Sequence, residues 1–283
     1  MHWILQDNLF NEKAYQVLLD TLRRMDIPHS IHKVVPFVGD LLPEPDFATK
    51  NVMCMGSYSL RHYAKKKGWY PGVFDLEPFD FTEQLQHWKQ HMLNADAVVS
   101  TFKDCKFTDT EMFIRPIHDS KVFAGKIMDK TKFEDWQHRV VQLKLDCGDS
   151  LTADTLVQVC TLKQIFSEHR FWIVKGRIIT SSTYKIGSKV VYKPLIDDRY
   201  GEYVINRLTE WRPLEAFVID VADTPEGIKV IEINTLNSCG FYSADLQKLI
   251  VSLEDNFDEE AQALLAVEKE ISQENERISK GWY

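Results

Sequence analysis

The stretch FVIDVADTPEGIKVIEINTLNSCGFY, residues 217–242, carries the clearest structural pattern in the chain. AFVIDVA (216–222) and IKVIEIN (228–234) are runs of strand-forming residues, and the DTPEG between them is rich in turn formers. The sequence therefore predicts a β-hairpin. We expect a three-residue loop, Pro225–Glu226–Gly227, in which the proline suits the first turn position and the glycine suits the left-handed position.

This loop would set the pairing of the two strands. Because side chains alternate with a period of two, Asp220, Glu232 and Asn234 fall on one face. Opposed carboxylates repel each other, and Lys229 points to the other face, so a positive group should lie between them. The loop predicts these opposed pairs: Thr224 and Ile228, Ala222 and Val230, Asp220 and Glu232, and Val218 and Asn234.

Two carboxylates and an amide form an oxygen-rich set that suits a hard cation. Mg²⁺ takes one or two carboxylates together with waters and substrate phosphates. The hairpin therefore predicts a magnesium site at Asp220, Glu232 and Asn234. The alternative is a solvated hairpin face on which the acids are incidental.

Composition narrows the class of protein. The chain has 283 residues, 44% of them hydrophobic, and a net charge of −8, which fits a soluble globular protein and disfavours a nucleic-acid-binding surface. Its five cysteines include no CxxC pair, which fits a reducing compartment and disfavours a zinc site. A nucleophilic role for Cys239 is disfavoured because no histidine lies near it in sequence. With no apolar run of membrane-spanning length, we expect a cytoplasmic protein without nucleic-acid or membrane partners.

The first hundred residues alternate between apolar strand patterns and helical stripes. Such alternation is typical of an α/β domain with a parallel or mixed sheet, and we expect one over residues 1–104. Thr82 is the expected N-cap of its last helix. The predicted strands are 2–6, 29–37, 51–56 and 95–102, and the predicted helices are 11–25, 59–69 and 80–94.

From residue 105 the pattern changes to paired strands separated by helices, which indicates an α+β unit over residues 105–250. Residues 251–283 are expected to form a C-terminal helix that packs on the core. The predicted strands of the second unit are 111–117, 121–128, 156–162 and the hairpin 168–184, with its turn at Lys175–Gly176. The predicted helices are 129–144, 197–211, 243–257 and 259–278.

Four stretches of the second unit, taken in chain order, resemble the ATP-grasp ligases. They are FIRPIHDSKVFAG (113–125), LVQVCTLKQIFSEHRFWIVKGRIITSSTY (156–184), FVIDVA (217–222) and VIEINTLNSCGFY (230–242). The resemblance implies an ATP-grasp fold, in which the nucleotide lies between two α+β lobes preceded by a small α/β domain. In that family an aspartate on one strand and E-I-N on the next hold Mg²⁺ against ATP. The resemblance therefore implies Asp220, Glu232 and Asn234 as the metal ligands.

The resemblance also implies cations for the ATP phosphates. FIRP stands where the family usually has a Lys-Pro strand, so Arg115 would contact the phosphates and is suited to bidentate contact. The family's glycine-rich loop normally follows, but this chain has HDSKVFAG, which lacks clustered glycines. Lys121 would supply part of the lost attraction; its alternative is a solvated turn lysine.

Two further segments complete the implied nucleotide site. LVQVC resembles the hinge between the lobes, where backbone groups of Val159 and Cys160, with Gln158 beside them, would bind adenine. EHRFWIV resembles the family's Glu-x-Arg strand. Glu168 and Arg170 would then share a face, with Arg170 directed at the transferred phosphate or the substrate carboxylate. The alternative is a structural Glu–Arg surface pair.

The expected substrate residues follow the same strands. Ser182 and Tyr184 lie on the return strand of the 168–184 hairpin, and Asn237, Ser238 and Tyr242 follow the metal-binding strand. Loops after such strands often carry specificity, so we expect these five residues to line the substrate cleft.

The resemblance implies an ATP-dependent carboxylate–amine ligase with ATP and Mg²⁺ as its cofactors. A carboxylate would attack the terminal phosphate of ATP, and an amine would capture the acylphosphate to give an amide. One substrate is expected to be an amino acid or peptide. Two alternatives stay open: a phosphotransferase on the same fold that leaves phosphate on its acceptor, and a non-catalytic nucleotide- or partner-binding protein, which the missing glycine-rich loop favours.

Overall fold

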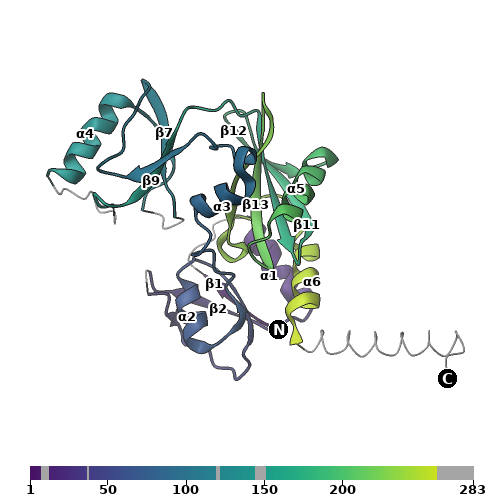
Figure 1. Cartoon of the computed structure of the whole chain (residues 1–283). Helices are drawn as coiled ribbons and strands as arrows, with labels where there is room; N and C mark the ends of the chain where they lie inside the picture. Colours follow the sequence, from purple (N-terminus) through teal and green to yellow (C-terminus); the bar gives the residue numbers. More distant parts are fainter. Residues whose placement is uncertain (8–12, 37, 119–121, 144–150, 260–283) are drawn as a thin grey trace, which may run out of the picture.

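Three β-sheets and the helices that cover them form the described body of the protein (Figure 1). The structure is a computed structural model, and it describes residues 1–7, 13–36, 38–118, 122–143 and 151–259. The predicted C-terminal helix over 259–278 therefore lies almost entirely outside the described residues.

The N-terminal domain is built on a mixed sheet with the strand order β3-β2-β1-β4-β5. From β1 the chain passes to β2 on one side and later to β4 on the other, and these strands are parallel. Ligands of open α/β sheets bind at the carboxyl ends of the strands where the order reverses, here β1 and β4. The elements are β1 (His2–Gln6), α1 (Lys13–Arg24), β2 (His29–Val34), β3 (Leu41–Leu42), β4 (Asn51–Met55), α2 (Leu60–Lys67) and β5 (Tyr70–Gly72).

The large sheet is antiparallel throughout and has the order β12-β11-β10-β13-β14. The predicted turn at Lys175–Gly176 is confirmed, because both residues have positive φ, 48° and 76°, as a two-residue hairpin turn requires. The elements are β10 (Ser167–Val174), β11 (Arg177–Ile186), β12 (Lys189–Pro194), α5 (Asp198–Glu210), β13 (Ala216–Thr224) and β14 (Gly227–Asn234).

The small lobe is a four-stranded antiparallel sheet with the order β6-β9-β7-β8. The 95–102 strand pattern, assigned from sequence to the first domain, forms β6 and pairs with β9 in this sheet. The topology therefore ends the N-terminal sheet before β6, and residue 104 does not separate the two sheets. The elements are β6 (Val98–Thr101), β7 (Glu111–Pro116), β8 (Lys126–Asp129), α4 (Lys130–Val141) and β9 (Leu156–Cys160).

The hydrophobic cores show how the three parts are joined. One core runs from the N-terminal sheet, through α1 and α6 (Leu246–Phe257), to Trp172 and Val218 of the large sheet. The opposite face of the large sheet packs on α5 and on α3 (Phe81–Trp88). The small lobe has a separate core around Phe102 and Phe133 and extends away from the rest in Figure 1.

The predicted hairpin forms, but its loop differs from the prediction. Thr224 pairs with Gly227, so Pro225–Glu226 is a two-residue loop rather than part of a three-residue one. Asp220 nevertheless pairs with Glu232, because Ile231 is an extra residue in β14 that restores the predicted register beyond it. The bulge therefore brings the three oxygen-bearing side chains to one face in spite of the shorter loop.

Other differences from the sequence prediction are local. The N-cap of α3 is Asp80, whose carboxylate accepts the backbone N–H groups of Thr82 and Glu83, so the expected Thr82 cap was wrong. The strand expected from residue 121 begins at Lys126. Three short or exposed strands, β3, β5 and β12, carry too little apolar alternation to have been expected.

Candidate active site

The predicted metal-binding residues lie together at one end of the hairpin. The side-chain nitrogen of Asn234 lies 3.1 Å from Asp220 Oδ2 and 3.2 Å from Glu232 Oε1. A single donor within reach of both carboxylates shows that these two oxygens face a common point. Asp220 is buried, whereas Glu232 and Asn234 are partly exposed.

Arg170 neutralises the buried member of the group. It lies directly opposite Asp220 in the ladder between β10 and β13. Its Nε donates to Asp220 Oδ1 at 2.8 Å and its Nη2 donates to Oδ2 at 2.7 Å, which is a bidentate pair. Both side chains are almost fully buried, at 8% and 2% exposed. Burial opposes the charge on Arg170, but Asp220 raises its pKa well above the usual value.

Arg115 neutralises the other carboxylate from a different sheet. Its Nη1 lies 2.5 Å from Glu232 Oε2, and this ion pair joins β7 of the small lobe to β14 of the large sheet. Two arginines therefore supply the positive charge that the opposed carboxylates require. The sequence analysis found no cation for this face within the hairpin itself, because both arginines come from strands distant in sequence.

The two carboxylates differ in how strongly they hold a proton. Burial raises the pKa of Asp220, and the nearby Glu232 and Glu168 add to this although Arg170 lowers it. Burial also acts to raise the pKa of Glu232, but Arg115 and Asn234 outweigh it, so the net shift is downward. Glu232 is therefore the member of the pair that holds its negative charge most firmly.

The donor set fits a magnesium ion. Among the described residues no three His, Cys, Asp or Glu side chains come together as a metal site. The group here instead combines two carboxylates with one amide, and Mg²⁺ completes such a sparse set with waters and substrate phosphates. Asp220 Oδ2 and Glu232 Oε1 already converge on one point, and a cation there would take over charge neutralisation from the arginines.

Glu168 and Tyr184 lie on the same side of the sheet as Arg170. Glu168 does not pair with Arg170; its Oε1 accepts a 2.6 Å ion pair from Lys185. This contradicts the alternative of a Glu–Arg surface pair. Tyr184 stacks on Tyr242 with ring centroids 5.0 Å apart, and the Arg170 guanidinium lies 4.7 Å from the Tyr242 ring. Burial raises the pKa of Tyr242 to about 12, so its hydroxyl stays protonated.

The expected adenine hinge is only partly available. Gln158 is buried opposite Arg115 in the ladder between β7 and β9. Val159 has β6 on one side and β7 on the other, so its backbone groups face neighbouring strands and are not free for adenine. Cys160 is the last residue of β9, and the connector to β10 begins there. Lys121 lies outside the described residues.

Two of the expected substrate residues have other tasks. The Ser182 hydroxyl is fully buried, donates to backbone oxygens and accepts the Ser243 N–H at 3.2 Å. Asn237 is 1% exposed and ties the large sheet to the N-terminal domain. Its amide donates to the backbone oxygens of Cys54 and Gly72 and accepts the Phe74 N–H at 2.8 Å.

The remaining residues after the metal strand differ from these. Ser238 is partly exposed at the end of a 3₁₀ turn (Leu236–Ser238), and Tyr242 stacks beside Arg170 as described. Cys239 is buried, and burial raises the pKa of its thiol to about 11. A protonated, buried thiol agrees with the sequence argument against a nucleophilic cysteine.

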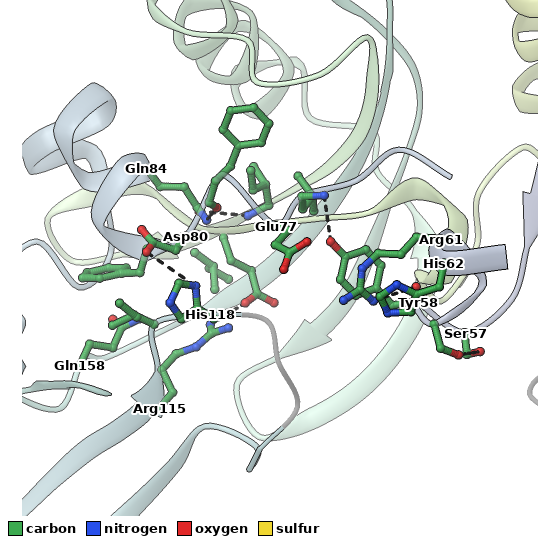
Figure 2. A pocket seen from close by; sticks show the side chains of 18 of the residues that line it. Ser57, Tyr58, Arg61, His62, Glu77, Asp80, Gln84, Arg115, His118 and Gln158 are labelled. Atoms are coloured by element: carbon green, nitrogen blue, oxygen red, sulfur yellow. Dashed lines mark hydrogen bonds and ion pairs between the residues drawn. The ribbon is translucent and has the colours of Figure 1, made fainter. Parts of the chain in front are cut away.

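A cavity of about 820 Å³ adjoins the Arg115–Glu232 pair. It also lies at the carboxyl ends of β1 and β4, where Gln6 and Ser57 line it (Figure 2). Sequence reasoning missed this wall, although the ends of parallel strands were the signal that could have found it. The polar lining residues drawn in Figure 2 include Ser57, Tyr58, Arg61, His62, Glu77, Asp80, Gln84, Arg115, His118 and Gln158.

A family model decides the class of this protein. The model, described as an ATP-grasp domain of clade family 3, matches residues 42–253, which is most of the chain. The chain belongs to the ATP-grasp family. Its three sheets and the helices that cover them are the α/β and α+β architecture of that fold. ATP-grasp enzymes in general bind ATP with Mg²⁺ and join a carboxylate to an amine.

Solved structures share the fold at low sequence identity. A RimK domain ATP-grasp protein from Sphaerobacter thermophilus DSM 20745 is 11% identical with a TM-score of 0.59, covering 88% of this chain and 98% of its own. The D-alanine–D-alanine ligase from Bacillus anthracis, complexed with ATP, is 14% identical with a TM-score of 0.56, covering 93% and 99%. The macrocyclase MdnC from Microcystis aeruginosa MRC, bound with precursor peptide MdnA, is 13% identical with a TM-score of 0.56, covering 92% and 100%.

Two other comparisons complete the findings. No curated protein sequence matches the chain. Within the residues that the structure describes, no helix combines the length and the apolar character needed to cross a bilayer.

Proposed function

We propose that this ATP-grasp protein is an ATP-dependent carboxylate–amine ligase that acts on an amino acid or peptide. ATP would be cleaved to ADP and phosphate by way of an acylphosphate. The observation that carries the proposal is the convergence of Asp220 and Glu232 on one point with Asn234 between them. Two arginines that can contact phosphate lie next to this group.

Each residue has a role that follows from its position. Asp220, Glu232 and Asn234 would hold Mg²⁺, which supplies charge neutralisation for the ATP phosphates when it is bound. Arg115 lies between the two lobes, so it would move its charge from Glu232 to a phosphate when nucleotide enters. Arg170 is held in place by Asp220 and faces the same cleft, where it would stabilise negative charge that develops on the transferred group.

The nucleotide site has less support away from the phosphates. Gln158 lies beside Arg115 on the adjoining strand, and Glu168 is held near the site by Lys185. Because Val159 is enclosed in its sheet, we place the adenine contact at the end of β9 and the connector that follows Cys160. Tyr184, Ser238 and Tyr242 remain the candidates from the large sheet for contact with substrate.

Substrate dependence tests the proposal. ADP release would be measured across pairs of amino acids and small acids, with mass spectrometry of the products. A ligase releases ADP only when both an acid and an amine are present, and the product carries a new amide. ADP release with an acceptor alone, together with a stable phosphorylated product, would establish a phosphotransferase instead. Failure of the folded protein to bind MgATP would establish a non-catalytic protein.

A further inference from the structure

Glu77 is a charged group in the cavity wall that the proposed ATP and metal site does not use. It lies in the segment between β5 and α3 (Figure 2). In that view Glu77 lies between the end of the cavity with Arg115 and His118 and the end with Tyr58 and Arg61. A substrate in the cavity would therefore pass the Glu77 carboxylate on its way to the Arg115–Glu232 pair.

The other carboxylates of the cavity wall have cationic partners. Glu232 pairs with Arg115 at 2.5 Å. Asp80 caps the N-terminus of α3 and lies 3.7 Å from His118. Among the residues that the structure describes, no hydrogen bond or ion pair reaches the side chain of Glu77. Its negative charge is thus available to a ligand in the cavity.

The backbone around Glu77 is held in place. The Glu77 N–H donates to Asp75 Oδ1 at 3.1 Å, and the Leu76 N–H donates to the Tyr58 hydroxyl at 3.0 Å. The Tyr58 hydroxyl in turn donates to Asp75, and the Arg61 guanidinium lies over the Tyr58 ring at 4.0 Å. These contacts fix the position from which the Glu77 side chain enters the cavity, as a binding residue requires.

We propose that the cavity binds the amine substrate and that the Glu77 carboxylate binds its ammonium group. At neutral pH a primary amine arrives as a cation, and a carboxylate without a cationic partner attracts it. Leu76, Phe79 and Ile231 also line the cavity, so its walls suit an amine that carries an apolar group. The identification of this amine as a substrate rests on the proposed ligase function, but its binding does not.

Binding of two matched probes tests the proposal on the full chain without nucleotide. Phenethylamine and phenethyl alcohol share an apolar body and differ in the charged group. Ligand-observed NMR titrations should show that the wild-type protein binds the amine at least about tenfold more tightly than the alcohol. Glu77→Gln should abolish this preference and leave the affinity for the alcohol unchanged. Glu83→Gln, which removes a neighbouring carboxylate that does not line the cavity, should retain the preference.

Three results would overturn the amine site: no binding of phenethylamine to the wild-type protein, equal binding of the two probes, or an unchanged preference in Glu77→Gln. Binding of Mg²⁺ with a non-hydrolysable ATP analogue, measured on the same samples, separates this inference from the ligase function. Glu77→Gln should bind the analogue as the wild type does. Failure of the wild type to bind the analogue, with the amine preference intact, would contradict the ligase function and leave the amine site standing.

Discussion

Two arginine–carboxylate pairs lie side by side in the site but in opposite surroundings. Arg170 and Asp220 lie on neighbouring strands of one sheet, are 8% and 2% exposed, and form two hydrogen bonds. Arg115 and Glu232 lie on different sheets, are 24% and 25% exposed, and form one close contact. The first pair is thus part of the large sheet, whereas the second connects that sheet to the small lobe.

The difference separates a fixed part of the site from a movable part. Removing one member of a buried pair leaves an uncompensated charge, which is costly, whereas a partly exposed pair contributes little to stability. The small lobe also has its own hydrophobic core. We therefore expect Arg170 and Asp220 to stay in place during the reaction and Arg115 to exchange partners as the small lobe moves over the nucleotide.

The largest expected effect is that of Arg170→Met. It leaves the Asp220 carboxylate buried without a cation, so the free energy of unfolding should fall by about 3–5 kcal/mol in urea titrations. Arg199→Met is the matched control, because Arg199 pairs with Asp223 at a 54% exposed position and should cost less than about 1 kcal/mol. Adding Asp220→Leu to Arg170→Met should recover most of the loss. Equal losses in the two single variants would show that burial does not distinguish the pairs.

Acid sharpens the comparison by testing the large sheet alone. His169, on β10 beside Arg170, is buried, and burial lowers its pKa to about 4 from 6.5. The unfolded chain therefore binds a proton that the folded chain excludes between these pH values. Stability is fully present above pH 6.5 and should fall by about 3 kcal/mol as the pH drops to 4.

The contribution of His169 is measured as a difference between variants. Unfolding free energies at pH 7 and pH 4.5 would be compared for the wild type and His169→Gln, because His2 has a similarly lowered pKa and contributes in both. The variant should lose less stability on acidification than the wild type. An equal loss in both proteins would show that His169 is not held neutral by the fold.

Arg115→Met should have the smallest effect on stability, below about 1 kcal/mol, because the pair it breaks is partly exposed. It should nevertheless weaken the binding of a Mg²⁺–ATP analogue by roughly tenfold or more, since a charge-assisted phosphate contact is lost. Arg139→Met, on α4 of the same lobe, should bind the analogue as the wild type does. A large loss of stability with normal nucleotide affinity would make Arg115 a structural residue.

The sequence predicted the fold where the pattern is local. The strands of the hairpin and the turn at Lys175–Gly176 follow from β-branched runs and turn chemistry within a few residues. β6 was assigned to the wrong sheet because its partner, β9, lies more than fifty residues later and nothing local specifies that pairing. The predicted loop was one residue too long, and only the bulge at Ile231 preserved the pairing of Asp220 with Glu232.

The site was predictable to the same extent. Asp220, Glu232 and Asn234 could be brought together because they lie on adjacent strands of one hairpin. Their cationic partners could not, since Arg115 and Arg170 reach them through tertiary contacts over long separations in sequence. Asn237 and Ser182 were expected at the substrate because polar residues after a strand often bind ligands. Their amide and hydroxyl instead bind backbone groups inside the fold.

Calorimetric titration with a non-hydrolysable ATP analogue, with and without Mg²⁺, tests the central claim most directly. The proteins are the wild type, Glu232→Gln and Asp223→Asn, which lies on the same strand as Asp220 but pairs with Arg199. The account predicts that the wild type and Asp223→Asn bind the analogue far more tightly with Mg²⁺ and that Glu232→Gln loses this dependence. Equal magnesium dependence in all three proteins, or binding that ignores magnesium, would contradict it.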